Sequence, residues 1–277
     1  MTDYGHDLRF GVFITPSAAD AHDVLRLAKL AEREQLDLVT FQDHPYQRRF
    51  LDAWTLLAMV AAQTDRIFLA PNVANLPLRL PVTIAKAAAS IDIASEGRFH
   101  LGLGAGAFWD RIEGVGGPRR TPGESVDALS ESIDVIRAFW GDGDDPVSFE
   151  GEHYRLTGAD PGPVPFERIE IWLGAYKPRM LRLTGRKADG WLVSMGGAPP
   201  EALGEMTKQI DAAAEQAGRD PQLIRRLYNV NKDLSARQMA QLYADHGMSA
   251  FILMTDDADE IKRFAHDIAP MVRELVP

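Results

Sequence analysis

The feature of this sequence that most constrains its fold is a regular alternation of short apolar runs with longer amphipathic stretches. The apolar runs are typical of buried strands, and apolar residues recur at helical spacing in the stretches between them. Eight such strand–helix pairs fill the chain and leave no remainder for a second domain. The predicted strands are 8–14, 37–41, 67–73, 98–102, 170–174, 190–194, 223–230 and 250–254.

The stretches between these strands predict helices. The predicted helices cover 21–31, 54–61, a segment that begins at Pro81, 126–140, 178–187, 200–217, 236–246 and 256–269. Strands that alternate with helices pair in parallel through right-handed crossovers. Eight such units close most naturally into a (β/α)8 barrel, and we expect residues 1–277 to form a single domain of this class. An open doubly wound sheet is the competing fold.

The fourth unit carries an insertion. Residues 104–123 are rich in Gly and Pro and predict a long loop. Residues 147–149 and 153–156, joined around Gly151, predict a small hairpin before the chain returns to the repeat.

Composition excludes several classes of function. The chain has no Cys, which excludes disulfides, cysteinyl zinc sites, iron–sulfur clusters and thiol nucleophiles. We expect no metal site. The net charge of −10 argues against nucleic acid as the main partner. No basic stretch followed by an apolar run begins the chain, and no run of about 18 apolar residues occurs, so we expect a cytoplasmic protein without a membrane span.

In a (β/α)8 barrel, functional residues lie at the carboxyl ends of the strands. The second predicted strand ends in Asp43 and His44, followed by Pro45. Histidine exchanges protons near neutral pH, which makes His44 the best candidate for acid–base chemistry. The competing interpretation is a histidine that caps the following loop. His100 lies inside a predicted strand and is expected to pack in the barrel interior.

Two further strand ends carry small or polar residues. Asn72 and Asn75 follow the third strand and could bind a ligand ring or hydroxyl, or could satisfy turn backbone. The segment 102–106 reads Gly-x-Gly-x-Gly and lacks both the spacing and the following helix of a dinucleotide fingerprint. We interpret its glycines as allowing close approach of a flat ligand to the backbone.

The fifth strand end has the character of an anion site. Gly174 and Ala175 precede Lys177, Pro178 and Arg179, and proline suits the first turn of a helix. Backbone amides and the helix dipole favour negative charge there. The alternative is an ordinary solvated helix start.

The chain resembles the luciferase-like monooxygenase superfamily, and within it the branch that uses the deazaflavin coenzyme F420. The resemblance covers essentially the whole chain. The motifs that carry it are Leu-Arg-Phe-Gly-Val from Leu8, Asp43-His44, Thr-x-Arg-Ile from Thr64, the segments 90–99 and 101–106, Ile-Trp-Leu-Gly-Ala-Tyr-Lys-Pro-Arg-Met from Ile171, and Ala-Asp-Gly-Trp from Ala188.

The resemblance implies the following roles. Asp43 would contact the edge of the deazaflavin ring, and His44 would face the substrate as proton donor or acceptor. Asn72-Val73 falls where members of the family have a non-proline cis peptide behind the ring. Further contacts to the coenzyme are implied for Asn75, Ala105 and Gly106 at the ring and ribityl chain, for Gly174, Ala175, Lys177 and Pro178 at the phosphate, and for Gly196 and Gly197 nearby.

One departure from the family pattern bears on the substrate. Members that oxidise sugar phosphates carry a Glu directly after the Gly-x-Gly segment, and this chain has Ala107 there. A carboxylic acid is therefore missing, which puts sugar-phosphate oxidation in doubt. Tyr46, Phe108 and Trp109 could form an aromatic mouth for a flat or hydrophobic substrate, or could simply pack the loop.

The sequence therefore predicts an F420-dependent oxidoreductase that transfers a hydride between the coenzyme and a small organic substrate. Two alternatives remain: a monooxygenase that uses reduced FMN and oxygen, and a protein that binds a flavin or deazaflavin without turnover. A homodimer is common among members of the family.

Overall fold

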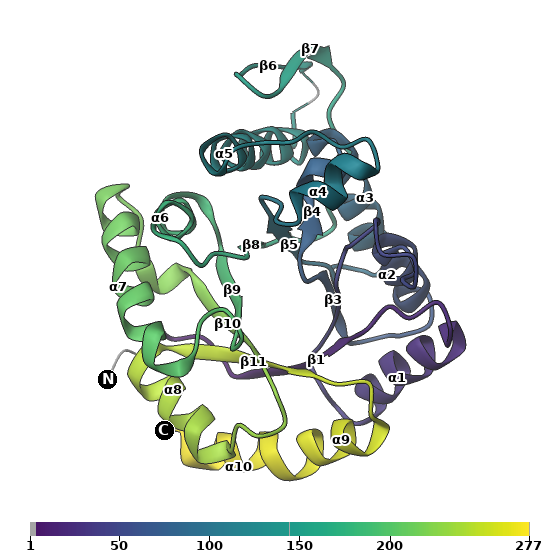
Figure 1. Cartoon of the computed structure of the whole chain (residues 1–277), viewed down its shortest axis with the longest axis vertical. Coiled ribbons are helices and arrows are strands. Elements are labelled where there is room, and N and C mark those ends of the chain that lie inside the picture. Colours follow the sequence, from purple (N-terminus) through teal and green to yellow (C-terminus); the bar gives the residue numbers. More distant parts are fainter. Residues whose placement is uncertain (1–3, 144, 277) are drawn as a thin grey trace.

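A computed structural model of the chain describes residues 4–143 and 145–276, and it shows a ring of parallel strands surrounded by helices (Figure 1). The strands are β1 (Arg9–Ile14), β2 (Leu38–Phe41), β3 (Phe68–Pro71), β4 (Ala74–Asn75), β5 (Leu101–Gly104), β6 (Val147–Glu150), β7 (Arg155–Ala159), β8 (Ile171–Leu173), β9 (Gly190–Ser194), β10 (Arg225–Val230) and β11 (Met248–Met254).

Helices follow most of these strands and form the outer layer. They are α1 (Ala21–Arg33), α2 (Ala53–Ala61), α3 (Pro81–Ala94), α4 (Trp109–Gly114), α5 (Pro122–Phe139), α6 (Pro178–Lys187), α7 (Pro200–Gln216), α8 (Ala236–His246), α9 (Ala258–Arg263) and α10 (Ala269–Leu275). Short 3-10 turns cover Leu76–Leu78 and Pro221–Leu223, and a π-helical turn covers Phe264–Ile268. Within the described ranges, no helix is both long and apolar enough to cross a membrane.

The strands pair in the order β3-β2-β1-β11-β10-β9-β8-β5-β4. Strands β3 and β4 are two halves of the third barrel strand, interrupted at Asn72 and Val73. The ring closes because Leu69 of β3 bridges Phe99, just before β5, and because β4 pairs with β5. The predicted (β/α)8 barrel is confirmed. The predicted hairpin is present as β6 and β7, although its second strand covers Arg155–Ala159 instead of 153–156, and it projects beyond α5 (Figure 1).

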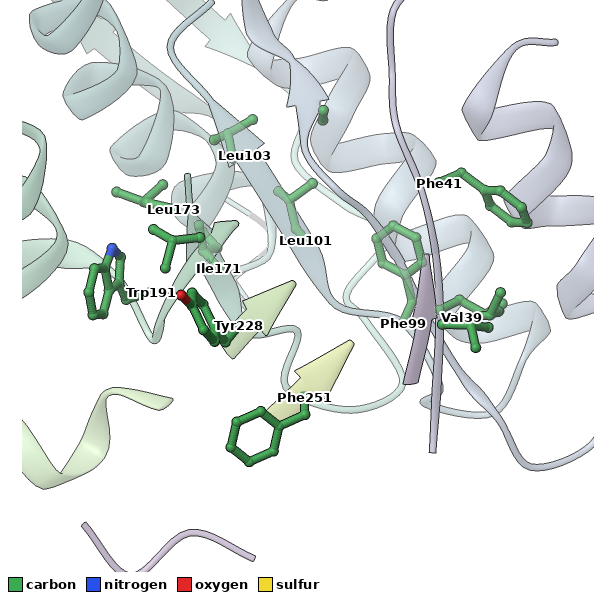
Figure 2. Packing of buried hydrophobic residues seen from close by; sticks show 14 of the residues in the cluster. Val39, Phe41, Phe99, Leu101, Leu103, Ile171, Leu173, Trp191, Tyr228 and Phe251 are labelled. Atoms are coloured by element: carbon green, nitrogen blue, oxygen red, sulfur yellow. The ribbon is translucent and has the colours of Figure 1, made fainter. Parts of the chain in front are cut away.

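Two apolar layers hold the barrel together. The larger one lies between strands and helices, and Figure 2 shows residues of it from several strands, including Val39, Leu101, Trp191 and Phe251. The smaller one fills the inside of the ring and consists of Leu38, Ala70, Trp172, Leu192, Leu227, Ala250 and Ile252. This division follows from the alternation of side chains along each strand.

Several predicted boundaries in the fourth unit are wrong, including the start of the helix 126–140, which begins at Pro122. The fourth strand runs from Leu101 to Gly104 instead of 98–102. Residues 98–100 still run beside β3, because the Leu69 N–H donates to the Arg98 carbonyl at 2.8 Å and the His100 N–H donates to the Leu69 carbonyl at 2.9 Å, but they form only an isolated bridge there. The predicted loop 104–123 also contains helix α4, whose Ile112 is fully buried.

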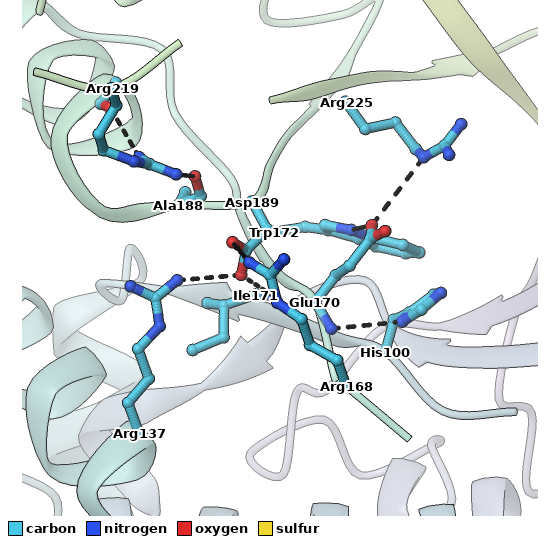
Figure 3. A network of polar contacts seen from close by, with 11 residues as sticks. His100, Arg137, Arg168, Glu170, Ile171, Trp172, Ala188, Asp189, Arg219 and Arg225 are labelled. Atoms are coloured by element: carbon cyan, nitrogen blue, oxygen red, sulfur yellow. Dashed lines mark hydrogen bonds and ion pairs between the residues drawn. The ribbon is translucent and has the colours of Figure 1, made fainter. Parts of the chain in front are cut away.

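A polar network lies at the amino-terminal ends of β8 and β9 (Figure 3). Asp189 accepts hydrogen bonds from Arg137 at 3.0 Å, from Arg168 at 2.6 Å and from the backbone N–H of Ile171 at 3.0 Å. The network joins α5 to β8 and β9. It gives the Ala-Asp-Gly-Trp motif around Asp189 a structural role far from the strand ends that carry function.

His100 is part of the same end of the barrel and is buried, as predicted. Its ring stacks on Phe68 at 5.1 Å between centroids and lies 4.8 Å from the ring of Trp172. Burial lowers the pKa of His100 from 6.5 to about 4, with the charges of Arg9 and Arg225 adding to the effect and that of Glu170 opposing it.

This burial predicts a loss of stability in acid. Between pH 6.5 and about 4 the unfolded chain binds a proton at His100 that the folded chain excludes, so the free energy of unfolding falls as the pH falls. At about 1.4 kcal/mol per pH unit, this side chain removes about 3 kcal/mol over that window. Urea unfolding of the protein and of His100→Gln across this range measures the effect. The variant should show the shallower pH dependence, and equal slopes would contradict the assignment.

Candidate active site

A cavity of about 1000 Å³ opens at the carboxyl ends of the barrel strands. Its walls come from the segments after β2, β5 and β8 and from the first turns of α4, α5 and α6. The predicted site residues that line it are Asp43, His44, Tyr46, Asn72, Val73, Asn75, Ala105, Gly106, Phe108, Trp109, Gly174, Lys177 and Pro178. The structure therefore gathers predicted residues from four strand ends around one cavity.

Three predicted residues lie outside the cavity wall. Ala175 is fully buried, and its carbonyl accepts a hydrogen bond from the indole N–H of Trp191 at 2.8 Å. Gly197 packs against the ring of Tyr176, and Gly196 is exposed beside it.

The floor of the cavity is a belt of hydrogen-bonded polar side chains. Asn72 and Asn229 exchange two hydrogen bonds between their side-chain amides, at 2.8 and 3.1 Å. The Asn72 amide also donates to Thr40 at 3.2 Å, and the Asn229 amide donates to Ser194 at 2.8 Å. Each of these four residues stands two positions after an apolar residue of the inner layer, so it faces the same interior one level higher.

Sequence reasoning missed Asn229 and Ser194 as site residues. The signal was present, because both are polar residues at inward positions near the carboxyl ends of their strands. This signal can be recognised only when the residues that face the inside of the barrel are known for each strand.

The glycines of β5 allow the segment from Pro71 to Val73 to pack closely against that strand. A Cβ on Gly102 would lie 2.1 Å from the carbonyl oxygen of Pro71, and one on Gly104 would lie 2.6 Å from the Val73 side chain. The interpretation that these glycines admit a flat ligand is therefore wrong for Gly102, whose close neighbour is β3. The predicted cis peptide between Asn72 and Val73 is present.

This packing predicts that Gly102→Ala destabilises the protein by about 1–3 kcal/mol, the usual cost of forcing a methyl into a filled space. Gly114→Ala is the matched control, because nothing lies within 4 Å of its Cβ position. Urea midpoints of the two variants measure the difference. Equal midpoints would contradict the prediction, because they would show that β3 can shift to admit the methyl group without a loss of stability.

Asp43 is a buried anchor for one wall of the cavity. Its side chain is 1% exposed and accepts from Arg79 Nε at 3.0 Å and Arg79 Nη2 at 3.2 Å. The backbone N–H of Asn75 and the indole N–H of Trp54 also donate to it, at 3.0 and 3.3 Å. Both carboxylate oxygens are thus engaged by the protein. Sequence reasoning did not find Arg79, which is distant from Asp43 along the chain.

The next residue, His44, lies in an aromatic cluster with Tyr46 and Phe108. Its Nδ1 lies 2.6 Å from the hydroxyl of Tyr46, and Phe108 packs against both rings. Burial lowers the pKa of His44 below 6.5, although the nearby charge of Asp43 opposes the shift. The imidazole is therefore neutral at neutral pH, so it can either give or take a proton.

The far end of the cavity carries positive charge. Helix α6 begins at Pro178, and the backbone N–H groups of Arg179 and Met180 in its first turn have no helical acceptors. Lys177 lines the cavity here and has no ion-pair partner within the described residues, whereas Arg179 pairs with Asp127 of α5 at 2.7 Å. The helix dipole and Lys177 together suit an anion such as a phosphate.

Within residues 4–143 and 145–276, no three or more His, Asp or Glu side chains gather in a way that could hold a metal ion. The chemical groups at the site are thus a neutral histidine, a cluster of aromatic rings, a floor of side-chain amides and a positively charged end.

Comparison with known proteins places this arrangement in a family. The model of the luciferase-like monooxygenase family matches residues 8–231. The chain belongs to this family. Its motifs now separate into two groups, because Asp43-His44 and the glycine segments border the cavity, whereas Asp189 and Arg98 hold the framework.

Relatives in this family have named activities. The chain is 30% identical over 233 residues to an F420-dependent glucose-6-phosphate dehydrogenase of Nocardia farcinica, covering 81% of this chain and 68% of the relative. It is 31% identical over 246 residues to a 5,10-methylenetetrahydromethanopterin reductase of Methanolobus tindarius, covering 85% of this chain and 70% of the relative. The structure of an F420-dependent secondary alcohol dehydrogenase with an F420-acetone adduct has the same fold, with a TM-score of 0.85 at 18% identity over 97% of this chain and 100% of that one.

Proposed function

We propose that this protein is an F420-dependent oxidoreductase that transfers a hydride between the coenzyme and a small, uncharged organic substrate. The observation that carries the proposal is that one cavity joins an anion-binding helix end to a neutral histidine in an aromatic mouth. The named activities of relatives at about 30% identity support the choice of coenzyme.

The residues present fit a deazaflavin that carries a phosphate. A cavity of about 1000 Å³ has room for a tricyclic ring with a side chain. The side-chain oxygen of Asn75 is buried without a hydrogen-bond partner in the described part of the chain, so the wall keeps an acceptor available for a ligand. Val73, Asn75, Ala105 and Gly106 would border the ring and chain, and the first turn of α6 with Lys177 would hold the phosphate.

When bound, the deazaflavin supplies two-electron hydride chemistry, and the protein supplies orientation and proton exchange. His44 would donate a proton to the substrate heteroatom during reduction, or accept one from a hydroxyl during oxidation. Burial holds the imidazole neutral, which is the form able to do either. Phe108 and Trp109 would exclude water from the reacting atoms.

The charge of the cavity restricts the substrate. Asp43 is the only carboxylate among the described residues of the wall, and Arg79 neutralises it. Ala107 lines the cavity at the position where sugar-phosphate-oxidising members of the family carry a Glu. The aromatic rings of Tyr46 and Phe108 favour a flat or apolar alcohol, carbonyl, imine or activated alkene over a sugar.

A turnover screen tests this proposal. The purified protein is incubated with oxidised F420 and secondary alcohols, and with reduced F420 and ketones, imines or enones, while the absorbance of the coenzyme is followed. Glucose 6-phosphate is the comparison substrate. We expect turnover with an uncharged compound and none with glucose 6-phosphate. Turnover with the sugar phosphate alone would contradict the proposed substrate class, and binding without any turnover would favour a carrier.

A flavin monooxygenase is the second candidate, because the matching family is named for monooxygenases and the anion end of the cavity would equally suit FMN. Oxygen consumption with reduced FMN in the same screen would favour it.

A further inference from the structure

We propose that Tyr46 is the second member of a proton relay, in which its hydroxyl group resupplies His44 with the proton that His44 exchanges at the substrate. The relay rests on the proposed oxidoreductase function and adds a residue to it. It assigns Tyr46 a role in proton transfer in addition to its packing against His44 and Phe108.

The geometry of the pair is fixed by its neighbours. The Tyr46 hydroxyl lies 2.6 Å from His44 Nδ1, and the two rings meet edge to face at 88° with centroids 5.3 Å apart. Phe108 of the loop before α4 packs against both, at 5.7 Å from His44 and 6.3 Å from Tyr46. A hydrogen bond held in this way keeps the imidazole in one orientation.

The relay requires one tautomer of the pair. Within the described residues, the Tyr46 hydroxyl has no acceptor other than His44 Nδ1. In the relay, the Tyr46 O–H donates to Nδ1, and the neutral imidazole carries its own hydrogen on Nε2. Nε2 has no partner within the described residues, and His44 lines the cavity, so this hydrogen is available to a substrate.

The step balances without any further reactant. As a substrate oxygen or carbon gains a proton, the Nε2–H bond of His44 breaks and a new bond forms to the substrate. Nδ1 takes the proton of the Tyr46 hydroxyl, which leaves a neutral imidazole and a phenolate. After the product leaves, Nε2 takes a proton from water in the cavity, and Nδ1 returns its proton to the phenolic oxygen. One proton passes from solvent to substrate, and both side chains regain their starting forms. Oxidation runs the same steps in reverse.

The charged groups around the pair suit this task. Asp43 faces it from the end of β2, where Arg79 neutralises it, and Arg111 faces Tyr46 from α4. Burial raises the pKa of Tyr46, and the charge of Arg111 opposes that rise. The ground state is thus neutral on both rings, and Arg111 would stabilise negative charge that develops on the phenolic oxygen.

The first test needs no coenzyme. The protein is labelled with ¹⁵N in its histidines, and long-range proton–nitrogen spectra report which ring nitrogen of His44 carries hydrogen. His44→Gln assigns the signal among the seven histidines of the chain. We expect the Nε2–H form in the wild type, and loss of that fixed form in Tyr46→Phe. Tyr176→Phe removes a hydroxyl from the same cavity and should leave the His44 signal in place. The Nδ1–H form in the wild type, or unchanged signals in Tyr46→Phe, would overturn the relay even if the proposed function holds.

The second test measures proton transfer in turnover. With a substrate found by the screen, Tyr46→Phe should lower kcat at least about tenfold while KM changes little. We then measure kcat in mixtures of H2O and D2O. A plot of kcat against the fraction of deuterium should be curved for the wild type, because two protons move in the same step. It should be linear for Tyr46→Phe, in which only one proton moves. A linear dependence in both would contradict the relay. Absence of any coenzyme-dependent turnover in the wild type would instead contradict the proposed function.

Discussion

His44→Ala should lower kcat by about 10²- to 10⁴-fold, the usual contribution of a positioned general acid or base. The affinity for coenzyme F420 should stay close to that of the wild type, because the phosphate site that we propose lies at the start of α6, which the variant does not change. Steady-state kinetics and a coenzyme titration of the same preparation measure both quantities.

The matched control for this prediction is His22→Ala, which removes an exposed imidazole from the first turn of α1 that does not line the cavity. It should retain wild-type kcat. If His44→Ala also turned over at the wild-type rate, the proton would have to come from another group, and the role proposed for His44 would be lost.

Asp43→Ala should destabilise the protein by about 3 kcal/mol, because it leaves Arg79 without its buried partner and the backbone N–H of Asn75 without an acceptor. Coenzyme affinity should fall as well, since Asn75 lines the cavity and is held in place by Asp43. Urea unfolding and a coenzyme titration measure the two effects.

A comparison within the same ion-pair cluster sharpens the prediction. Asp52 pairs with the same Arg79 at 2.5 Å but is 42% exposed and caps α2 through the backbone N–H of Thr55. Asp52→Ala should therefore cost only about 1 kcal/mol, the usual value of a helix cap. Equal costs for the two variants would show that burial of Asp43 contributes nothing.

Much of the fold followed from local signals. The predicted bounds 178–187, 190–194 and 236–246 coincide with α6, β9 and α8. Helix α8 shows why: Ser235 and Gln238 form a capping box at its start, and Gly247 adopts a left-handed conformation at its end. These signals are local, so the sequence specifies them completely.

The errors came where a residue's neighbours are distant along the chain. Glycine is typical of loops, and the sequence predicts a loop from Gly104, yet this residue extends β5 because Asn75 of β4 pairs with it. Helix α4 is a short segment within Gly- and Pro-rich sequence, and it buries Ile112 against the rest of the barrel. Neither contact can be inferred from periodicity.

The same distinction applies to the site. Asp43 and His44 could be predicted because they directly follow a strand, where barrel geometry places functional residues. Asn229 and Arg79 could not be predicted in this way. Asn229 matters because the closed barrel places it beside Asn72, and Arg79 matters because it pairs with Asp43.

The most direct test of the proposed function is a titration of the purified protein with coenzyme F420 and, separately, with FMN, followed by fluorescence or heat. We expect tight binding of F420 and weak binding of FMN. The reverse preference would contradict the proposed coenzyme and favour a flavin monooxygenase. Binding of neither would contradict the assignment of the anion site at Lys177 and the first turn of α6, and with it the proposed function.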